Sequence, residues 1–315
     1  MTKERLVGPQ YLEENEEPIM MAYYRTWRDV EMPSDANADS SEENVIRMTD
    51  IPKNIDIVSV FHHVKPGTDQ EAFWNTLRDD YVPILHERGQ RIVRTVDYTA
   101  LLEIREETGK DSDSLTKEDY RQFAEEYVEK TITPWNLDGL DIDMEQPKIT
   151  DAETTIVANV MKELSKILKI NDDNEKLLIY DTNMDNHKLF KKIAPYISYL
   201  FIQAYGRELS TLDTSWDSYK EDIASTKVLF GISFPEENDK NIWHDTVGEY
   251  TDSRAYKYAI WQPKDGEKAG MFVYAIDRDG KEYGDNTISE TDFAWTRALT
   301  ESLKEAHDTL EKNNK

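Results

Sequence analysis

Three carboxylates alternate with apolar residues in one short segment of the sequence, residues 137–147 (LDGLDIDMEQP). Successive side chains of a β-strand point to opposite faces, so a strand here places Asp141, Asp143 and Glu145 on one face and the apolar residues between them on the other. Like charges crowded in a dry site raise at least one pKa, and such a set shares a proton near neutral pH. The pattern therefore predicts a catalytic strand.

The spacing of these carboxylates suits proton transfer. Neighbouring members of the set lie about 6–7 Å apart along one strand face. A protonated Glu145 can donate to a leaving-group oxygen, and an ionised Asp143 can orient or stabilise a neighbouring group. A magnesium or calcium site is an alternative for three carboxylates, and an Asp-rich turn is another.

The elements around this segment alternate along the chain. Amphipathic stretches at 69–88, 117–130 and 151–168 are typical of helices, and short apolar runs between such stretches are typical of strands. Eight strand candidates in about 260 residues favour a single closed (β/α)8 TIM barrel, with its active site at the C-terminal ends of the strands. The expected strands are Ile19–Tyr24, Ile55–Phe61, Arg91–Val96, Leu140–Met144, Leu177–Tyr180, Tyr199–Tyr205, Val228–Phe234 and Met271–Ile276.

Composition excludes several classes of function. The chain has 315 residues, with 38 Lys and Arg against 64 Asp and Glu, and a net charge of −26. This charge argues against general binding to nucleic acids or to anionic membranes. The absence of cysteine excludes disulfides and thiolate catalysis. No apolar run reaches the roughly 18 residues that a membrane span needs.

The segment LDGLDIDMEQP resembles the DGxDxDxE signature of glycoside hydrolase family 18, with Asp138, Gly139, Asp141, Asp143 and Glu145 filling every position. The resemblance implies that Glu145 is the general acid/base. It also implies that Asp143 holds the 2-acetamido group of the substrate and that Asp141 supports Asp143 from beneath. In that family the N-acetyl oxygen of the substrate is the nucleophile. An oxazolinium intermediate forms, and the product retains its configuration.

A second segment, 199–207 (YLFIQAYGR), narrows the resemblance. Gln203 and Tyr205 share one strand face at the end of the sixth expected strand. Chitinases of the family tend to carry Met-x-Tyr-Asp here, whereas Gln-x-Tyr resembles the bacterial endo-β-N-acetylglucosaminidases that cut the chitobiose core of N-linked glycans. The resemblance implies that Tyr205 hydrogen-bonds the acetamido or oxazolinium oxygen and that Gln203 orients the sugar.

Other residues fit the site less specifically. Tyr274 is expected to face the sugar, and Trp27 or Trp243 to provide an apolar platform, although core packing is the commoner fate of a tryptophan. Asp97 and Asn183 follow the third and fifth expected strands, where each can line the site or cap a helix. The adjacent histidines at 62 and 63 are interpreted as loop or packing residues.

The sequence therefore predicts an endo-β-N-acetylglucosaminidase whose partner is the N-glycan of a glycoprotein. The mechanism needs no cofactor and no metal. A family 18 chitinase is the first alternative, and a weakly catalytic glycan-binding lectin is the second. The oligomeric state is left open.

Residues 1–17 are expected to form an acidic N-terminal extension, and residues 18–315 the catalytic barrel. The first residues contain no signal peptide, so the chain is either made without one or is a trimmed mature form. A secreted or cell-surface location is inferred from the substrate class alone. The choice among glycan classes is expected to rest on loops at 25–54, 97–118, 183–190 and 234–258.

Overall fold

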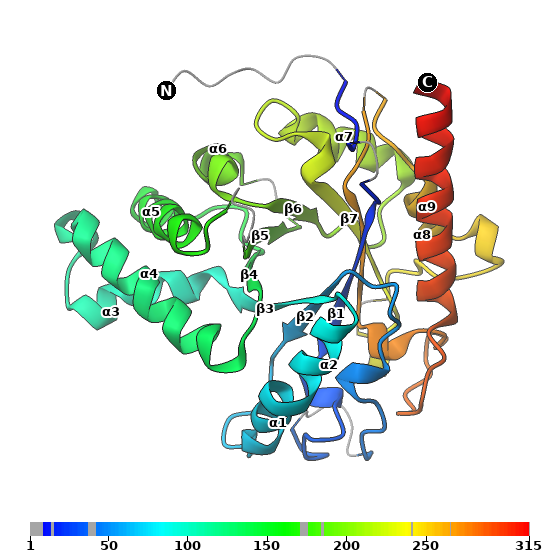
Figure 1. Ribbon diagram of the computed structural model, residues 1–315, viewed down its shortest axis with the longest axis horizontal. Helices are drawn as coiled ribbons and strands as arrows, with labels where there is room; N and C mark the ends of the chain where they lie inside the picture. The colour runs from blue at the N-terminus through cyan, green and yellow to red at the C-terminus, as the bar shows by residue number, and fades with distance from the viewer. Residues whose placement is uncertain are drawn as a thin grey trace.

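The computed structural model describes residues 9–13, 16–36, 42–170, 176–183, 186–240, 242–264 and 266–314. Its centre is a closed barrel of parallel strands that pair in chain order, with the last strand beside the first (Figure 1). The predicted TIM barrel is confirmed. The strands are β1 (Ile19–Arg25), β2 (Ile57–Phe61), β3 (Arg91–Asp97), β4 (Gly139–Met144), β5 (Leu177–Thr182), β6 (Tyr199–Ile202), β7 (Val228–Ser233) and β8 (Gly270–Tyr274).

The sixth strand is shorter than the sequence predicts. It ends at Ile202, and the Gln203 N–H donates to the carbonyl of Thr182, the last residue of β5, at 3.0 Å. Because β5 ends there, the backbone after Gln203 has no strand residue of β5 with which to form the next hydrogen bond. The chain turns instead at Gly206, whose φ of 68° favours glycine. Gln203 and Tyr205 therefore lie just beyond the strand.

Helices cover the outside of the barrel, as Figure 1 shows for α4 and α5 beside β4 and for α8 and α9 near β7. The expected helix at 69–88 is interrupted by one π-helical turn over residues 77–81. The described helices are α1 (Glu71–Thr76), α2 (Val82–Glu87), α3 (Ile104–Thr108), α4 (Lys117–Thr131), α5 (Asp151–Ile167), α6 (His187–Ile193), α7 (Leu209–Tyr219), α8 (Arg254–Ile260) and α9 (Ala294–Asn314).

Capping residues fix where the two longest crossover helices begin. The side-chain hydroxyls of Thr116 and Thr150 accept hydrogen bonds from the backbone N–H groups of Asp119 and Glu153. In return, the carboxylates of Asp119 and Glu153 accept from the threonine N–H groups. Each such reciprocal pair satisfies two otherwise unpaired donors. The cap at Thr150 starts α5 shortly after Glu145, so it fixes the far end of the loop that carries this carboxylate.

The side chains form two apolar layers that follow the alternation of the strands. Met21, Val93, Ile179, Phe201 and Phe272 belong to a small cluster inside the barrel. The larger cluster lies between the strands and the helices and includes the outward-facing apolar residues of β4. The predicted alternation along β4 is thereby confirmed, with its aspartates on the inner face.

A glycine lets β4 and β5 pack closely at their amino ends. A Cβ atom on Gly139 would lie 2.1 Å from the carbonyl oxygen of Leu177, which is far inside van der Waals contact. Gly139 pairs with Leu177 in the strand register, and Asp143 pairs with Asp181 at the other end of the same ladder. The glycine of the signature therefore stands where a side chain would clash with β5, in the same register that pairs Asp143 with Asp181.

The expected boundary at residue 17 remains a prediction. Within the described part of the N-terminal segment, Gln10 forms a backbone bridge with Gly266, and the Leu12 N–H donates to Glu267 at 3.1 Å. These contacts lie just before β8, at the amino ends of the strands. None of the helices in the described ranges is long and apolar enough to cross a membrane.

Candidate active site

A cavity of about 200 Å³ opens at the carboxyl ends of the strands. Seven of the ten residues expected from the sequence line it, and Tyr23, Phe61 and Asp181 line it as well. The seven expected residues are Asp143, Glu145, Asn183, Gln203, Tyr205, Trp243 and Tyr274.

Asp143 and Glu145 enter the cavity from the end of β4. Asp143 is the last inward residue of the strand, and Glu145 follows directly after the strand and is exposed. Burial, followed by the charges of the nearby carboxylates of Glu145, Asp141 and Asp97, raises the pKa of Asp143 to about 8. The pair therefore combines a solvent-accessible carboxyl group with a neighbour that holds its proton up to neutral pH.

Asp141 lies beneath the cavity and does not line it. Its Oδ2 accepts hydrogen bonds from the hydroxyls of Tyr23 and Thr95, each at 2.8 Å, and Thr95 in turn contacts Ser59. Burial raises the pKa of Asp141 to about 6, although these two hydroxyls lower it. Its position below Asp143 is the one that the family resemblance implies.

Asp181, at the end of β5, is the carboxylate that the sequence prediction missed. Its Oδ2 lies 2.9 Å from the Tyr23 hydroxyl and 2.9 Å from Gln203 Nε2. Gln203 Nε2 also donates to Asp143 Oδ1 at 3.3 Å. Asp181 directly follows the expected strand Leu177–Tyr180 with inward parity, and this was the signal available in the sequence.

Tyr205 and Trp243 form the side of the cavity beyond β6. The Tyr205 ring packs 6.4 Å from Trp243, and a Cβ on Gly206 would lie 2.7 Å from the Trp243 ring. The buried carboxylate of Asp245 joins the turn after β6 to the end of β7, since it accepts from the N–H groups of Gly206 and Ser233 at 3.0 Å each. Glycine is thus required where the indole lies against the turn.

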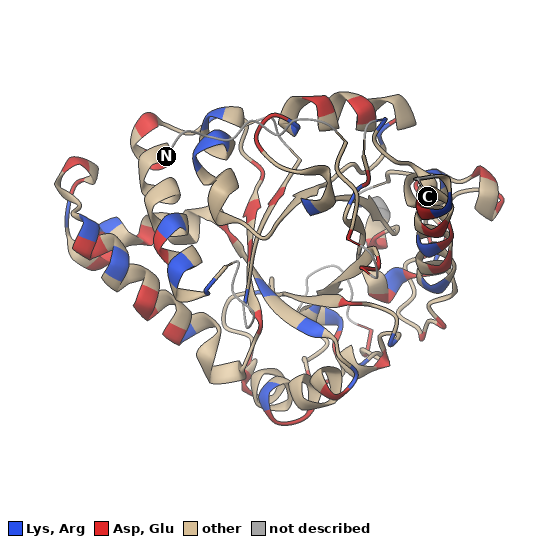
Figure 2. Cartoon of the chain, turned by 45° about the horizontal axis from the view of Figure 1, so that its top comes forward, with Lys and Arg blue, Asp and Glu red and all other residues tan. Residues whose placement is uncertain are grey.

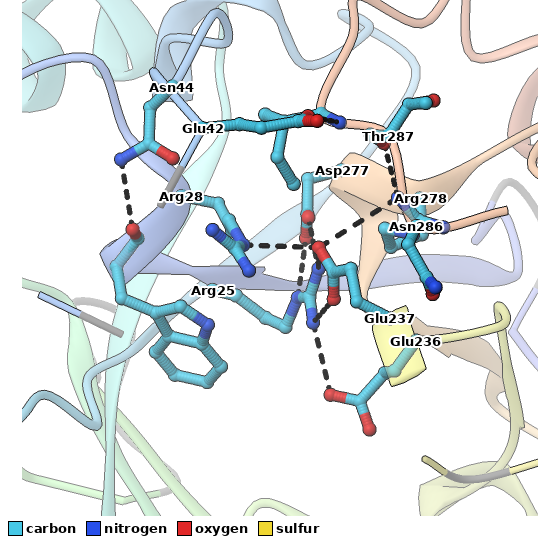
Figure 3. A network of polar contacts seen from close by, with 12 residues as sticks. Arg25, Arg28, Glu42, Asn44, Glu236, Glu237, Asp277, Arg278, Asn286 and Thr287 are labelled. Carbon is cyan, nitrogen blue, oxygen red and sulfur yellow. Dashed lines mark hydrogen bonds and ion pairs between the residues drawn. The ribbon is translucent and has the colours of Figure 1, made fainter. Parts of the chain in front are cut away.

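A buried ionic network lies next to this wall, behind Tyr274, whose ring is 6.1 Å from that of Tyr205 (Figure 3). Arg25, at the end of β1, contacts Glu236, Glu237 and Asp277, which come from the segments that follow β7 and β8. Glu236 also accepts from the Tyr274 hydroxyl at 3.1 Å. Through these contacts, the network fixes the position of Tyr274 in the cavity wall.

The structure does not bring Trp27 and Asp97 to the cavity. Trp27 is buried, with its ring 5.8 Å from Phe61. Asp97 caps the short 3₁₀ helix that follows β3 and accepts from the Thr99 N–H at 2.8 Å. The histidine at 62 bonds to Thr26, as a packing residue would.

Charge is spread over the outer helices, where acidic and basic residues are interspersed (Figure 2). In the described part of the chain, no group of three or more His, Cys, Asp or Glu side chains has an arrangement that could hold a metal ion. Of the cavity's carboxylates, Asp143 accepts from the Gln203 amide, and Asp181 contacts the Tyr23 hydroxyl and the same amide.

Comparisons with known proteins point to one group of enzymes. Residues 22–273 match the model of the endo-β-N-acetylglucosaminidase EndoS TIM-barrel domain. An endo-β-N-acetylglucosaminidase of Bifidobacterium longum subsp. infantis is 36% identical over 302 residues, which cover 92% of this chain and 55% of that protein. Endo-β-N-acetylglucosaminidase F2 of Elizabethkingia meningoseptica is 36% identical, with 89% of this chain and 80% of that protein covered. The chain thus spans about half the length of the first relative.

Solved structures agree with these matches. The apo crystal structure of endo-β-N-acetylglucosaminidase from Cordyceps militaris has a TM-score of 0.80 and 40% identity, with 92% of each chain covered. A double mutant of that enzyme was solved in complex with fucosyl-N-acetylglucosamine-Asn. A chitinase from Bacteroides thetaiotaomicron, at 10% identity and a TM-score of 0.58, shares the fold alone. The chain therefore belongs to the glycoside hydrolases of the EndoS TIM-barrel family, the endo-β-N-acetylglucosaminidases of family 18.

Proposed function

We propose that this protein hydrolyses the β-1,4 bond between the two N-acetylglucosamines at the core of N-linked glycans. The observation that carries the proposal is the convergence of Asp143, Glu145, Gln203 and Tyr205 on one small cavity. Cavities of about 300–1,000 Å³ bury drug-sized ligands, so one of about 200 Å³ suits a single sugar unit. That unit is the N-acetylglucosamine whose anomeric carbon reacts.

The reaction begins with proton transfer from Glu145 to the oxygen of the leaving sugar. The bond from this oxygen to the anomeric carbon breaks as the acetamido oxygen of the substrate attacks that carbon. The proton that Asp143 holds in the free enzyme passes to Glu145 when the substrate binds, so the ionised Asp143 accepts from the acetamido N–H and stabilises the positive charge of the oxazolinium ring. The Tyr205 hydroxyl donates to the acetamido oxygen, and Gln203 orients the sugar.

Water then completes hydrolysis. Glu145, now ionised, accepts a proton from the water that attacks the anomeric carbon, so the enzyme returns to its starting state. The water enters on the face that the leaving group vacated, and the product retains its configuration. No enzyme carboxylate bonds to the sugar, which distinguishes this route from a two-carboxylate retaining mechanism.

The loops around the cavity are proposed to choose the glycan class. The segment 97–118 contributes most of a second hollow of about 630 Å³, whose lining includes Tyr98, Glu103 and Lys110. The segment 234–258 supplies Trp243 and Glu236. Three of the expected loops include residues that lie outside the described part of the structure. These are residues 37–41 in the loop 25–54, residues 184–185 in the loop 183–190 and residue 241 in the loop 234–258. We further propose that the enzyme acts outside the cell, where glycoprotein substrates are met.

Intact-mass spectrometry of two glycoproteins, one with a high-mannose and one with a complex glycan, tests this function. Each glycoprotein is incubated with the enzyme, and chitin oligosaccharides are treated in parallel. We expect the mass of at least one glycoprotein to fall to that of the protein plus one N-acetylglucosamine, and Glu145→Gln to abolish the change. Cleavage of the chitin oligosaccharides alone would establish the chitinase alternative.

A further inference from the structure

Two buried aspartates on neighbouring strands share one tyrosine hydroxyl at the floor of the cavity. The Tyr23 hydroxyl oxygen lies 2.8 Å from Asp141 Oδ2 and 2.9 Å from Asp181 Oδ2. All three side chains are at most 2% exposed, so solvent does not mediate these contacts. Each distance is that of a direct hydrogen bond.

The two contacts of Tyr23 need two hydrogens, one for each hydrogen bond. If both aspartates are ionised, only one hydrogen is present. A tyrosine hydroxyl has a single hydrogen and donates it to one acceptor at a time. If both aspartates were ionised, one of the two contacts would join two buried oxygens with no proton between them. Since unpaired buried charge is costly, one aspartate must be a carboxylic acid that donates to the Tyr23 oxygen.

The neighbours of each aspartate indicate which one holds the proton. Asp141 accepts from the hydroxyl of Thr95 at 2.8 Å on the same oxygen that faces Tyr23, and two hydroxyl donors stabilise an ionised carboxylate. Asp181 accepts from the neutral amide of Gln203. Burial, followed by the charges of Asp141 and Asp143, raises the pKa of Asp181 well above its usual value.

The titratable groups that act most strongly on Asp181 are acids and tyrosines. The titratable groups that face it are Asp141 and Asp143 from β4, Tyr23 from β1 and Tyr205 beyond β6. None of these is a cation. The second oxygens of both aspartates, Asp141 Oδ1 and Asp181 Oδ1, are buried without a hydrogen-bond partner among the described residues. This costs less for a neutral carboxyl group than for a charged one, so it favours a proton on one of the pair, and the hydroxyl donors and charges described above indicate Asp181.

We propose that Asp181 is a positioning residue that carries a proton in the active enzyme. Its hydroxyl donates to Tyr23, Tyr23 donates to Asp141, and its oxygen holds the Gln203 amide within reach of Asp143. Loss of this proton breaks the series of hydrogen bonds at Tyr23. It also places a second negative charge, in addition to that of Asp141, beside Asp143. The proposal rests on the proposed function, because it assigns Asp181 to the machinery of that hydrolysis.

The pH profile of kcat/KM separates this role from a merely structural one. Asp181→Asn is neutral at every pH and keeps polar atoms facing Tyr23 and Gln203. We expect it to retain kcat/KM within about tenfold near pH 6 and to move the alkaline decline upward by about one pH unit. Asp181→Leu, which is neutral but cannot form hydrogen bonds, should lose about a hundredfold at every pH.

The control is Asp56→Asn at the opposite end of the barrel. Burial also raises the pKa of Asp56, which accepts from the Met20 N–H at 2.7 Å, far from the cavity. This variant should leave the pH profile unchanged. If Asp181→Asn loses as much activity as Asp181→Leu at every pH, the active form needs an ionised Asp181 and the proposal is wrong.

Infrared spectroscopy tests the proton without any activity. The carbonyl stretch of a neutral carboxylic acid should be present in the wild-type protein at pH 7 and reduced by one band in Asp181→Asn. An unchanged band would overturn the proposal even if glycans are cleaved. A band that disappears from a protein that cleaves no glycan would support the proton assignment and count against the proposed function instead.

Discussion

At the scale of single residues, Asp141, Asp143 and Asp181 lie side by side on two adjacent strands, and burial raises the pKa of each. An aspartate in the unfolded chain has a pKa of about 3.9. At these three sites the folded protein therefore binds more protons than the unfolded chain between about pH 4 and the raised pKa values. Their contribution to the free energy of unfolding falls as the pH rises through this range, so their ionisation costs stability near neutral pH.

Replacing Asp143 by asparagine should therefore stabilise the protein, and more so at higher pH. The variant lacks the group whose pKa is raised to about 8, so its melting temperature should exceed that of the wild type by roughly 2–4 °C at pH 8 and by less at pH 5. Differential scanning calorimetry at both pH values measures this gain. An equal or lower melting temperature at pH 8 would mean that Asp143 is not strained by burial.

At the scale of elements, the segments that follow β1, β7 and β8 are held together by one buried arginine. The Arg25 guanidinium is 1% exposed and lies 2.9 Å from Glu237 and 2.5 Å from Asp277. Burial opposes the ionisation of Glu237, yet Arg25 and Arg28 together lower its pKa to about 2. Glu237 therefore stays charged in the interior because the two arginines lie beside it.

Arg25→Met should consequently be strongly destabilising, since it leaves buried carboxylates without their counter-charge. Breaking such a buried pair costs about 3–5 kcal/mol, which lowers the melting temperature of a chain of this length by roughly 5–8 °C. Arg47→Met is the matched control, because Arg47 pairs with Glu31 at 2.9 Å but is half exposed. The control should change the stability by less than about 1 kcal/mol. Similar melting temperatures for the two variants would show that the network contributes little.

The strands and the alternation along β4 could be predicted from the sequence because both follow a local period. Gln203 and Tyr205 were expected to be in a strand, but β6 ends at Ile202 because its neighbour β5 ends at Thr182, and pairing between strands is not a local property. Asp181 was missed for a related reason. A lone carboxylate after an apolar run is ambiguous until Tyr23, far away in the sequence, is placed beside it.

Aromatic residues were the least predictable part of the site. Trp27 and Trp243 both follow expected strands, yet one is buried and the other is 40% exposed at the cavity. Trp243 lies against Gly206, whose missing side chain leaves room for the indole, whereas Trp27 packs against Phe61. Such a complementary pair lies in two loops, and sequence periodicity carries no information about it.

At the scale of the whole molecule, the net charge of −26 gives the enzyme a strong negative field. Acidic and basic residues are interspersed on the outer helices in Figure 2, but over the whole sequence the acidic ones outnumber the basic ones by 64 to 38. Such a field attracts cationic partners at low salt and is screened beyond about 10 Å at 0.1 M ionic strength. Association with a basic glycoprotein should therefore depend on salt.

We expect kcat/KM for a basic glycoprotein to fall by about tenfold between low salt and 0.3 M sodium chloride, because electrostatic attraction raises the association rate. A neutral glycopeptide with the same glycan is the control and should show little change. Initial rates at several salt concentrations measure both. If kcat/KM fell equally for the two substrates, salt would be acting on the enzyme itself, and electrostatic attraction between enzyme and glycoprotein would not explain the effect.

The most direct test of the catalytic account is the configuration of the first product. A glycopeptide with an intact chitobiose core is cleaved by the wild-type enzyme, and the anomeric proton of the released glycan is followed by NMR before mutarotation. Attack by the substrate's own acetamido group, with Glu145 as acid and then base, predicts that the β-anomer is formed first. Initial release of the α-anomer would contradict substrate-assisted catalysis at this site.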